Sequence, residues 1–160
     1  MQKSSAGKRI LAFLLDLLIL NLVIIQPIAF RLQKVIPLTT VDITAVSAFL
    51  QAHPAVAKEL DYLSVLAMLL IYSYFVLMEY FIGQTIGKKI MKLYVVATGP
   101  FLQHEKGNYK ITFVQAMLRN VCVLPLFPLV LLWIIDPLYL LFKKERFSDN
   151  YAHTAVIVSP

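Results

Sequence analysis

The feature that most constrains this chain is a set of three long apolar runs. They cover Ile10–Phe30, Tyr62–Ile82 and Asn120–Phe142, which are 21, 21 and 23 residues long. An α-helix needs about 20 such residues to cross a hydrocarbon layer of roughly 30 Å. Each run therefore has the length of a membrane span, and the sequence predicts an all-α integral membrane protein.

The composition agrees with this interpretation. Hydrophobic residues make up 59% of the 160-residue chain and charged residues only 15%, and the mean hydropathy is +0.75. Soluble domains contain about a quarter charged residues, because their surface has to be wetted. The lone Cys122 excludes an intrachain disulfide. Since a chain of this length has room for one domain, we interpret residues 1–160 as a single membrane domain.

Lysine and arginine are unevenly distributed over the polar segments. The N-terminal segment and the loop 83–119 together hold nine of them, against three in the loop 31–61. The positive-inside rule therefore predicts a multi-pass protein of the cell membrane with a cytoplasmic N-terminus. Because the formal charge of +6 is explained by these loops, we expect anionic lipid headgroups as partners and no nucleic acid. The candidate headgroup contacts are Lys88, Lys89 and Lys92.

The third run leaves two topologies open, since Pro125 and Pro128 interrupt it. Two β-prone stretches lie outside the runs, Lys92–Ala97 in the second loop and Thr154–Val158 in the tail. If they pair, they share one side of the membrane, and the third run re-enters as a hairpin. A straight crossing stays open, because membrane helices tolerate proline kinks. We favour the re-entrant hairpin with a small cytoplasmic β-pair.

The first loop holds a further predicted helix. Thr40 is a candidate N-cap for an amphipathic helix that runs to about Gln51 and ends before Pro54.

Three of the nine carboxylates lie inside the apolar runs, namely Asp16, Glu79 and Asp136. An ionised carboxylate at mid-bilayer costs at least about 2.5–3.5 kcal/mol, so such a group normally faces the bundle interior and has a partner. Arg9 shares a helix face with Asp16 but is roughly 10 Å away along the axis. We therefore expect Arg9 to reach a carboxylate of another span. With a cytoplasmic tail, the three carboxylates form one acidic layer, a candidate substrate or ion-binding site for a cation or proton.

Several short motifs, taken in order, resemble the RDD family of small membrane proteins, which is named for one arginine and two aspartates. The matching residues are Arg9-x-x-Ala12-x-x-x-Asp16, Gly83-Gln84-Thr85-Ile86-Gly87-Lys88-Lys89, Leu93-Tyr94-Val95-Val96, Leu118-Arg119-Asn120, Asp136, and Ser148-Asp149-x-x-Ala152-x-Thr154-x-Val156. The family often has proline at position 86 and histidine at position 148, and this chain has neither. The resemblance implies a polytopic membrane protein that is supposed to serve transport.

The motif residues outside the acidic layer are interpreted as structural. Gly83 is expected to end the helix of the second run and to allow a tight turn. Tyr72 lies seven residues before Glu79, where it is either a packing residue or a proton-relay partner. The remaining structural candidates are Gln84, Thr85, Gly87, Lys88, Asp149 and Thr154.

Two classes of function are consistent with these residues. The first is a transporter component, which would have to act as a homo-oligomer because alternating access normally needs more than three helices. The second is a non-transport scaffold, assembly factor or lipid-binding protein, in which the Arg/Asp cluster holds the bundle together.

No catalytic, cofactor or metal site is expected, and we interpret the chain as a non-enzyme. The segment Gly83–Lys88 is one residue short of a phosphate-binding loop. The three histidines, His53, His104 and His153, lie in separate polar segments, which is not a metal-ligand spacing.

Overall fold

Two long apolar helices dominate the computed structural model. It describes residues 4–35, 43–98, 110–124, 135, 139, 140, 142 and 146–158. Helical residues Ala6–Lys34 and Pro54–Ile82, 29 residues each, are long and apolar enough to cross a membrane. At 1.5 Å per residue each measures roughly 44 Å, more than a hydrocarbon layer requires. Both predicted helices are confirmed, and each begins earlier than its apolar run.

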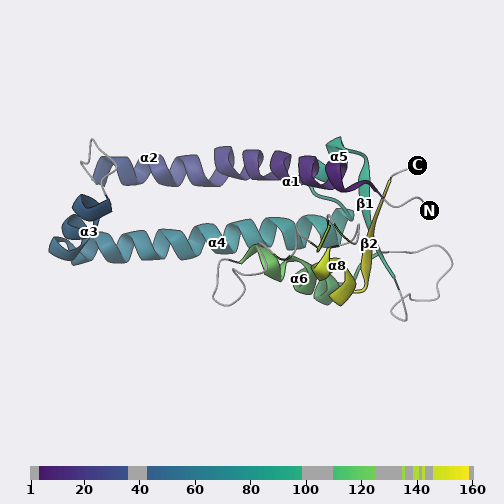
Figure 1. Cartoon of the computed structure of the whole chain (residues 1–160). Coiled ribbons are helices and arrows are strands. Elements are labelled where there is room, and N and C mark those ends of the chain that lie inside the picture. Colours follow the sequence, from purple (N-terminus) through teal and green to yellow (C-terminus); the bar gives the residue numbers. More distant parts are fainter. Residues whose placement is uncertain are drawn as a thin grey trace. The chain divides into compact units, whose positions relative to one another are not determined.

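The first long helix is not uniform. It consists of α1 (Ala6–Leu20), a π-helical turn (Asn21–Ile25) and α2 (Gln26–Val35) (Figure 1). Large apolar side chains point outward along it, which is the arrangement of a helix that faces lipid rather than a protein core. The exposed examples include Leu11, Leu14, Leu18, Leu22, Val23 and Phe30.

The second long helix, α4 (Pro54–Ile82), is preceded by the short α3 (Ile43–Ala52). Helix α3 confirms the predicted helix of the first loop, although its proposed cap Thr40 lies outside the described residues. At the other end of α4, the backbone of Gly83 has φ = +78°, and its N–H donates to the carbonyl of Glu79. This left-handed conformation suits glycine, so Gly83 ends the helix as predicted.

The remaining elements are short. They are α5 (Ile86–Ile90), β1 (Leu93–Ala97), α6 (Phe113–Asn120) with a 3₁₀ turn (Val121–Val123), α8 (Phe147–Tyr151) and β2 (Thr154–Val158). The two strands form an antiparallel pair in which Val95 lies opposite Val156 (Figure 1). The predicted β-pair is thereby confirmed. Most of the third apolar run, 125–134 and 136–138, lies outside the described residues.

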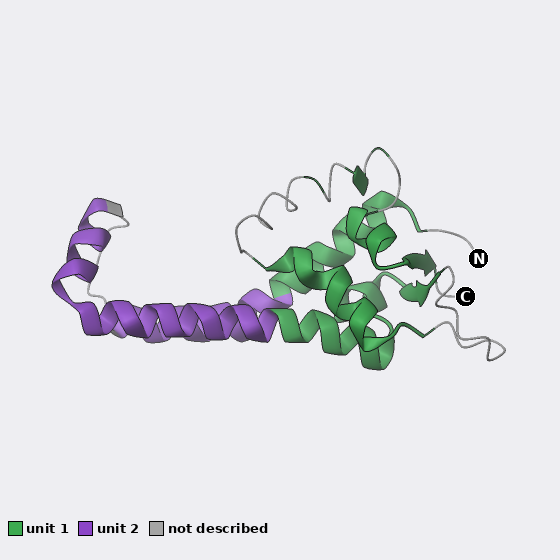
Figure 2. Ribbon diagram, turned by 90° about the horizontal axis from the view of Figure 1, so that it is seen from below, with its two compact units in different colours: residues 1–18, 72–160 green, residues 19–71 purple. Residues whose placement is uncertain are grey.

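The chain divides into two units, which are coloured separately in Figure 2. Unit 1 comprises residues 1–18 and 72–160, and unit 2 comprises residues 19–71. The core of unit 1 joins the sheet to the ends of α1, α4 and α6 and contains Ala12, Val76, Leu93, Val95, Ala97, Ile111, Ala116 and Val156. Unit 2 contains the rest of the long helices with α3, and its Arg31 pairs with Glu59 at 2.8 Å.

Candidate functional site

Asp16 lies on α1 with no solvent exposure. Its Oδ1 accepts hydrogen bonds from the Tyr74 hydroxyl at 2.7 Å and from the Gly87 backbone N–H at 2.8 Å. Its Oδ2 accepts one from the Thr85 hydroxyl at 2.5 Å. Buried polar groups need such partners. Because the three donors come from α4, the turn after it and α5, Asp16 ties three elements of unit 1 together.

The contact between α1 and α5 explains two small residues of the sequence motifs. Ala12 is fully buried, and a Cβ at Gly87 would lie 2.1 Å from the Ala12 carbonyl oxygen. Only glycine therefore fits at position 87. The close approach also brings the Gly87 N–H to Asp16, one helical turn after Ala12.

Glu79 is the second buried carboxylate of a long helix, also with no exposure. It pairs with the Lys88 ammonium through Oε1. Its Oε2 lies 3.4 Å from Nε of Arg119 and accepts a hydrogen bond from the Asn120 amide at 2.9 Å. Such charge-assisted contacts compensate the removal of the carboxylate from water. Glu79 therefore joins α4 to α5 and α6.

A third buried carboxylate, Asp149 on α8, binds two arginines. Oδ2 is 3.1 Å from Nη1 of Arg9, and Oδ1 is 3.1 Å from Nη2 of Arg119. Arg9 also donates to the Ser4 hydroxyl at 2.6 Å and to the Val156 carbonyl at 3.1 Å. The N-terminal end of α1 is thus fastened to the C-terminal segment.

Helix α6 holds Arg119 and Asn120 in place through its own N-terminal cap. Thr112 and Gln115 form a reciprocal capping box, which satisfies backbone donors at the helix start. The Gln115 amide also donates to the carbonyl of Ala152 at 3.2 Å. The guanidinium of Arg119, one turn further, donates to the Thr154 hydroxyl at 3.3 Å.

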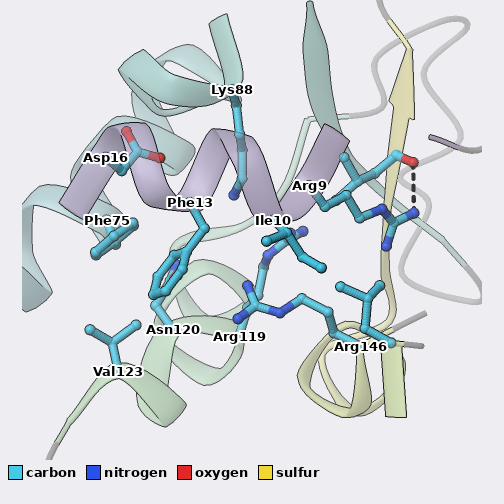
Figure 3. Close-up of a pocket in the computed structure, with 12 residues that line it drawn as sticks. Arg9, Ile10, Phe13, Asp16, Phe75, Lys88, Arg119, Asn120, Val123 and Arg146 are labelled. Atoms are coloured by element: carbon cyan, nitrogen blue, oxygen red, sulfur yellow. Dashed lines mark hydrogen bonds between the residues drawn. The ribbon is translucent and has the colours of Figure 1, made fainter. Parts of the chain in front are cut away.

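A cavity of about 190 Å³ lies within unit 1 beside these ion pairs. Its walls come from α1, α4, α5, α6, the 3₁₀ turn, β2 and the segment before α8. Four cationic side chains line it, namely Arg9, Lys88, Arg119 and Arg146. Figure 3 shows Lys88, Arg119 and Arg146 gathered on one side of Phe13, with Phe75 and Val123 on the other.

Lys88 is the titratable group of this wall that lies outside the long helices. Burial lowers the pKa of its ammonium, Glu79 acts in the opposite direction, and the charges of Arg119 and Arg146 lower the pKa again. Its neighbour Lys89 is exposed. Lys88, whose side chain is 12% exposed, is therefore a wall residue of the cavity, whereas the exposed Lys89 and Lys92 remain candidates for lipid contact.

The structure groups the predicted site residues differently from the acidic layer. Among the described residues, the carboxylate that Arg9 binds is Asp149, on a segment outside the apolar runs. Asp16 and Glu79 occupy two separate hydrogen-bond clusters. Asp136 lies outside the described residues.

Tyr72 forms a hydrogen bond with the backbone of α6 and not with a buried carboxylate. Its hydroxyl donates to the Met117 carbonyl at 3.1 Å, which is a packing role, and it is Tyr74 that meets a buried carboxylate. The structural candidates Thr85, Gly87, Lys88, Asp149 and Thr154 all enter the clusters described above. Gln84 is half-buried in the turn between α4 and α5.

Four residues of this region were not predicted as site residues. They are Tyr74, Arg119, Asn120 and Arg146. A signal existed for two of them, because Arg119 and Asn120 are polar residues at the start of an apolar run, where a lipid-facing helix would not place them.

In the described segments, no group of three His, Cys, Asp or Glu side chains is close enough to hold a metal ion.

The two long apolar helices, with a buried polar network at one end, define a helical membrane protein. Residues 3–153 match the RDD family, and the chain belongs to it. No curated protein and no solved structure matches the chain.

Proposed function

We propose that the chain is a component of a transport system of the cell membrane and that the cavity of unit 1 is its solute site. The cavity itself carries this proposal. Ligand sites are concave pockets, and a protein has few of them. A space of about 190 Å³, equivalent to roughly six waters of 30 Å³ each, with several charged side chains in its wall, has the character of a ligand site.

The contacts of Asp16 and Glu79 favour a structural role for both carboxylates over the binding of a metal cation. Three neutral donors already occupy the Asp16 oxygens. A cation at Glu79 would have to displace Lys88 or Arg119 from it. A proton, in contrast, needs no extra space. In this proposal a coupled proton moves on the Lys88–Glu79 pair, which lies beside the cavity.

The hydrogen bonds of the N-terminal segment support an even number of membrane crossings. The backbone N–H of Ser4 donates to Val156 of β2, and β2 pairs with β1. Segments joined in this way share one side of the membrane, and the basic loops make that side cytoplasmic. The third run is then re-entrant. In a variant that carries Ser159→Cys and has Cys122 replaced, the new thiol should not react with an impermeant thiol reagent in right-side-out vesicles. Labelling of intact vesicles would contradict this topology.

The alternative function is a non-transport scaffold or lipid-binding protein. The density of the ion-pair network favours it, because Glu79 and Asp149 together bind three cations on three elements of unit 1. Such a network fixes a bundle whether or not a solute passes.

A volume-recovery assay separates the two functions without knowledge of the solute. Purified protein is reconstituted in liposomes, which are shrunk in concentrated potassium salts of small organic acids, in glycerol or in choline chloride, with valinomycin present to balance charge. Entry of any of these solutes, faster than into protein-free liposomes, supports transport. Entry no faster than into protein-free liposomes for the whole panel favours the scaffold.

A pair of variants links this flux to the cavity. Val123 lines the cavity, and Val121 belongs to the same 3₁₀ turn but does not line it. We expect Val123→Trp to fill the space and abolish entry, and Val121→Trp to leave entry unchanged. Thermal denaturation of both variants shows that they fold. Equal entry through both would remove the cavity from the transport path.

A further inference from the structure

The wall of the cavity has an unequal charge distribution. Among the described residues, the cations Arg9, Lys88 and Arg119 share the two carboxylates Glu79 and Asp149. Arg146 is a fourth cation of the wall. Its guanidinium lies 5.8 Å from the centre of the Phe13 ring, a cation–π contact.

Among the described residues, Asp16 is the one carboxylate that lines the cavity, and its oxygens accept hydrogen bonds from other groups. The donors are the Tyr74 hydroxyl, the Thr85 hydroxyl and the Gly87 backbone N–H. In the described part of the wall, four cationic side chains thus stand against one carboxylate, so the charges there are mainly positive. In a site of low dielectric constant, such an arrangement attracts an anion more strongly than it would in water.

The rest of the wall is apolar. Ile10, Phe13, Phe75, Val123 and Leu140 line it, and the rings of Phe13 and Phe75 stack with their centres 6.1 Å apart. Phe75 and Val123 lie on the other side of Phe13 from the cationic groups (Figure 3). The cavity therefore has a positively charged part and an apolar part. A ligand that satisfies both needs an anionic head and an apolar chain.

We propose that the cavity binds a small amphiphilic anion, with its head between Lys88, Arg119 and Arg146 and a short apolar chain against Phe75 and Val123. This inference rests on the proposal that the cavity is the solute site. An alkyl sulfonate, carboxylate or phosphate has the required chemistry, and so does the anionic headgroup region of a membrane lipid.

The state of Lys88 is consistent with this ligand class. Burial and the charges of Arg119 and Arg146 lower the pKa of its ammonium, against the opposing effect of Glu79. An anion placed among these groups would favour the charged form of Lys88. The cavity is thus a place where a negative charge stabilises its surroundings.

Calorimetric titration of the protein in phosphatidylcholine nanodiscs tests the ligand class. Hexanesulfonate is a suitable probe, because it stays charged at all working pH values. We expect saturable binding with one site per chain. Methanesulfonate, which lacks the chain, should bind about tenfold more weakly or worse, since each buried methylene adds to the affinity. Hexyltrimethylammonium, which has the chain and the opposite charge, should not bind. Equal binding of the cationic probe, or no binding of hexanesulfonate, would overturn the proposal.

Two charge-neutralising variants separate the cavity from general surface attraction. Arg146→Gln removes a cation of the wall that lies over the Phe13 ring, and Lys89→Gln removes an exposed cation of α5. We expect a loss of affinity of about tenfold for the first variant, the scale of one charge-assisted hydrogen bond, and little change for the second. Arg146→Lys should restore part of the loss. Equal losses for Arg146→Gln and Lys89→Gln would contradict the proposal.

Nanodiscs of a second lipid composition distinguish a lipid occupant of the cavity from a soluble one. In nanodiscs that contain phosphatidylglycerol, a lipid occupant would compete with hexanesulfonate and reduce its apparent affinity in wild type. A soluble occupant would leave that affinity unchanged, and both results support the amphiphilic-anion site. The proposed transport function is tested separately. Binding without volume recovery would contradict transport alone, and recovery with neutral or cationic solutes but no anion binding would contradict the present inference alone.

Discussion

Units 1 and 2 contain parts of the same two long helices, yet a different kind of contact stabilises each unit. In unit 2 the buried side chains among the described residues are Leu20, Leu63 and Ala67, all apolar. Its one described ion pair, Arg31–Glu59, is largely exposed on the arginine side. In unit 1 buried carboxylates bind residues that are up to 140 positions away in sequence. Unit 2 therefore depends on hydrophobicity, and unit 1 depends on particular polar contacts.

The difference shows why the sequence motifs of this chain cluster where they do. A helix that faces lipid tolerates exchange among apolar residues, because any of them satisfies the same solvent. A buried carboxylate tolerates very little, because its charge and its lone pairs must be matched by specific donors. All the structural candidates named from the motifs, from Gly83 to Thr154, accordingly belong to unit 1.

The largest expected effect comes from a methyl group at the α1–α5 contact. Gly87→Ala places a Cβ 2.1 Å from the Ala12 carbonyl oxygen, and neither backbone can give way without loss of the Asp16 contacts. We expect unit 1 to lose on the order of 5 kcal/mol. The matched change Gly7→Ala meets no atom within 4 Å and should be neutral or stabilising by about 0.5–1 kcal/mol. Unfolding in mixed detergent–SDS micelles measures both, and similar stabilities would show that the close approach does not exist.

The second-largest expected effect is the loss of stability when a buried carboxylate is neutralised, which we compare with the same change at an exposed carboxylate. Asp149→Asn leaves Arg9 and Arg119 without their shared counter-charge, and breaking such a buried pair typically costs about 3–5 kcal/mol. Glu59→Gln removes the partner of Arg31 in unit 2, where a surface pair contributes about 0–1 kcal/mol. The same unfolding titration decides, and high salt should weaken only the second pair. A small effect of Asp149→Asn would mean that the network is not what holds unit 1 together.

Asp16→Asn should have a smaller effect, although Asp16 is the most enclosed residue of the first long helix together with Ala12. Asparagine keeps one acceptor oxygen for Tyr74 and Gly87, and its amide can donate to the Thr85 hydroxyl. We expect a loss of about 1–3 kcal/mol, the cost of one poorly matched buried group. Solute entry per folded molecule should then stay near the wild-type rate. Complete loss of entry in a fully folded variant would restore the cation or proton site at Asp16.

The sequence predicted the elements of this protein better than the partners of its charged residues. The length of the apolar runs predicted both long helices, and β-branched residues predicted that β1 and β2 pair. The interaction of Glu79 with the Lys88 region could also be expected, because nine residues separate them across a single turn. These features depend on local pattern or on short separations.

The partner of Arg9 could not be found in this way. Helix periodicity shows that Arg9 and Asp16 share a face, and it therefore drew attention to carboxylates inside the spans. Asp149 lies in a short polar segment whose position depends on the β1–β2 register and on the cap of α6. The capping box of α6 is a local pattern, but the strand register and the contact of Gln115 with the Ala152 carbonyl are tertiary features that no local pattern encodes. Tyr74 was missed for a related reason, since an aromatic residue in an apolar run looks like ordinary packing.

The smallest expected effect is a pH dependence of the affinity for hexanesulfonate. It should depend on Lys88 of unit 1 and not on a lysine of unit 2. Burial lowers the pKa of Lys88 below its usual value, so Lys88 loses its proton at a lower pH than an ordinary lysine does. Glu79, Arg119 and Arg146 are the charged groups that act on it. The affinity for hexanesulfonate should therefore be constant at low pH and fall as the pH rises through the lowered pKa of Lys88. Lys88→Arg keeps its charge and should bind with a flat pH profile, whereas Lys58→Arg should retain the wild-type decline. Calorimetric titration over the alkaline range measures all three proteins. A decline that persists in Lys88→Arg would assign the titration to another group and remove Lys88 from the anion site.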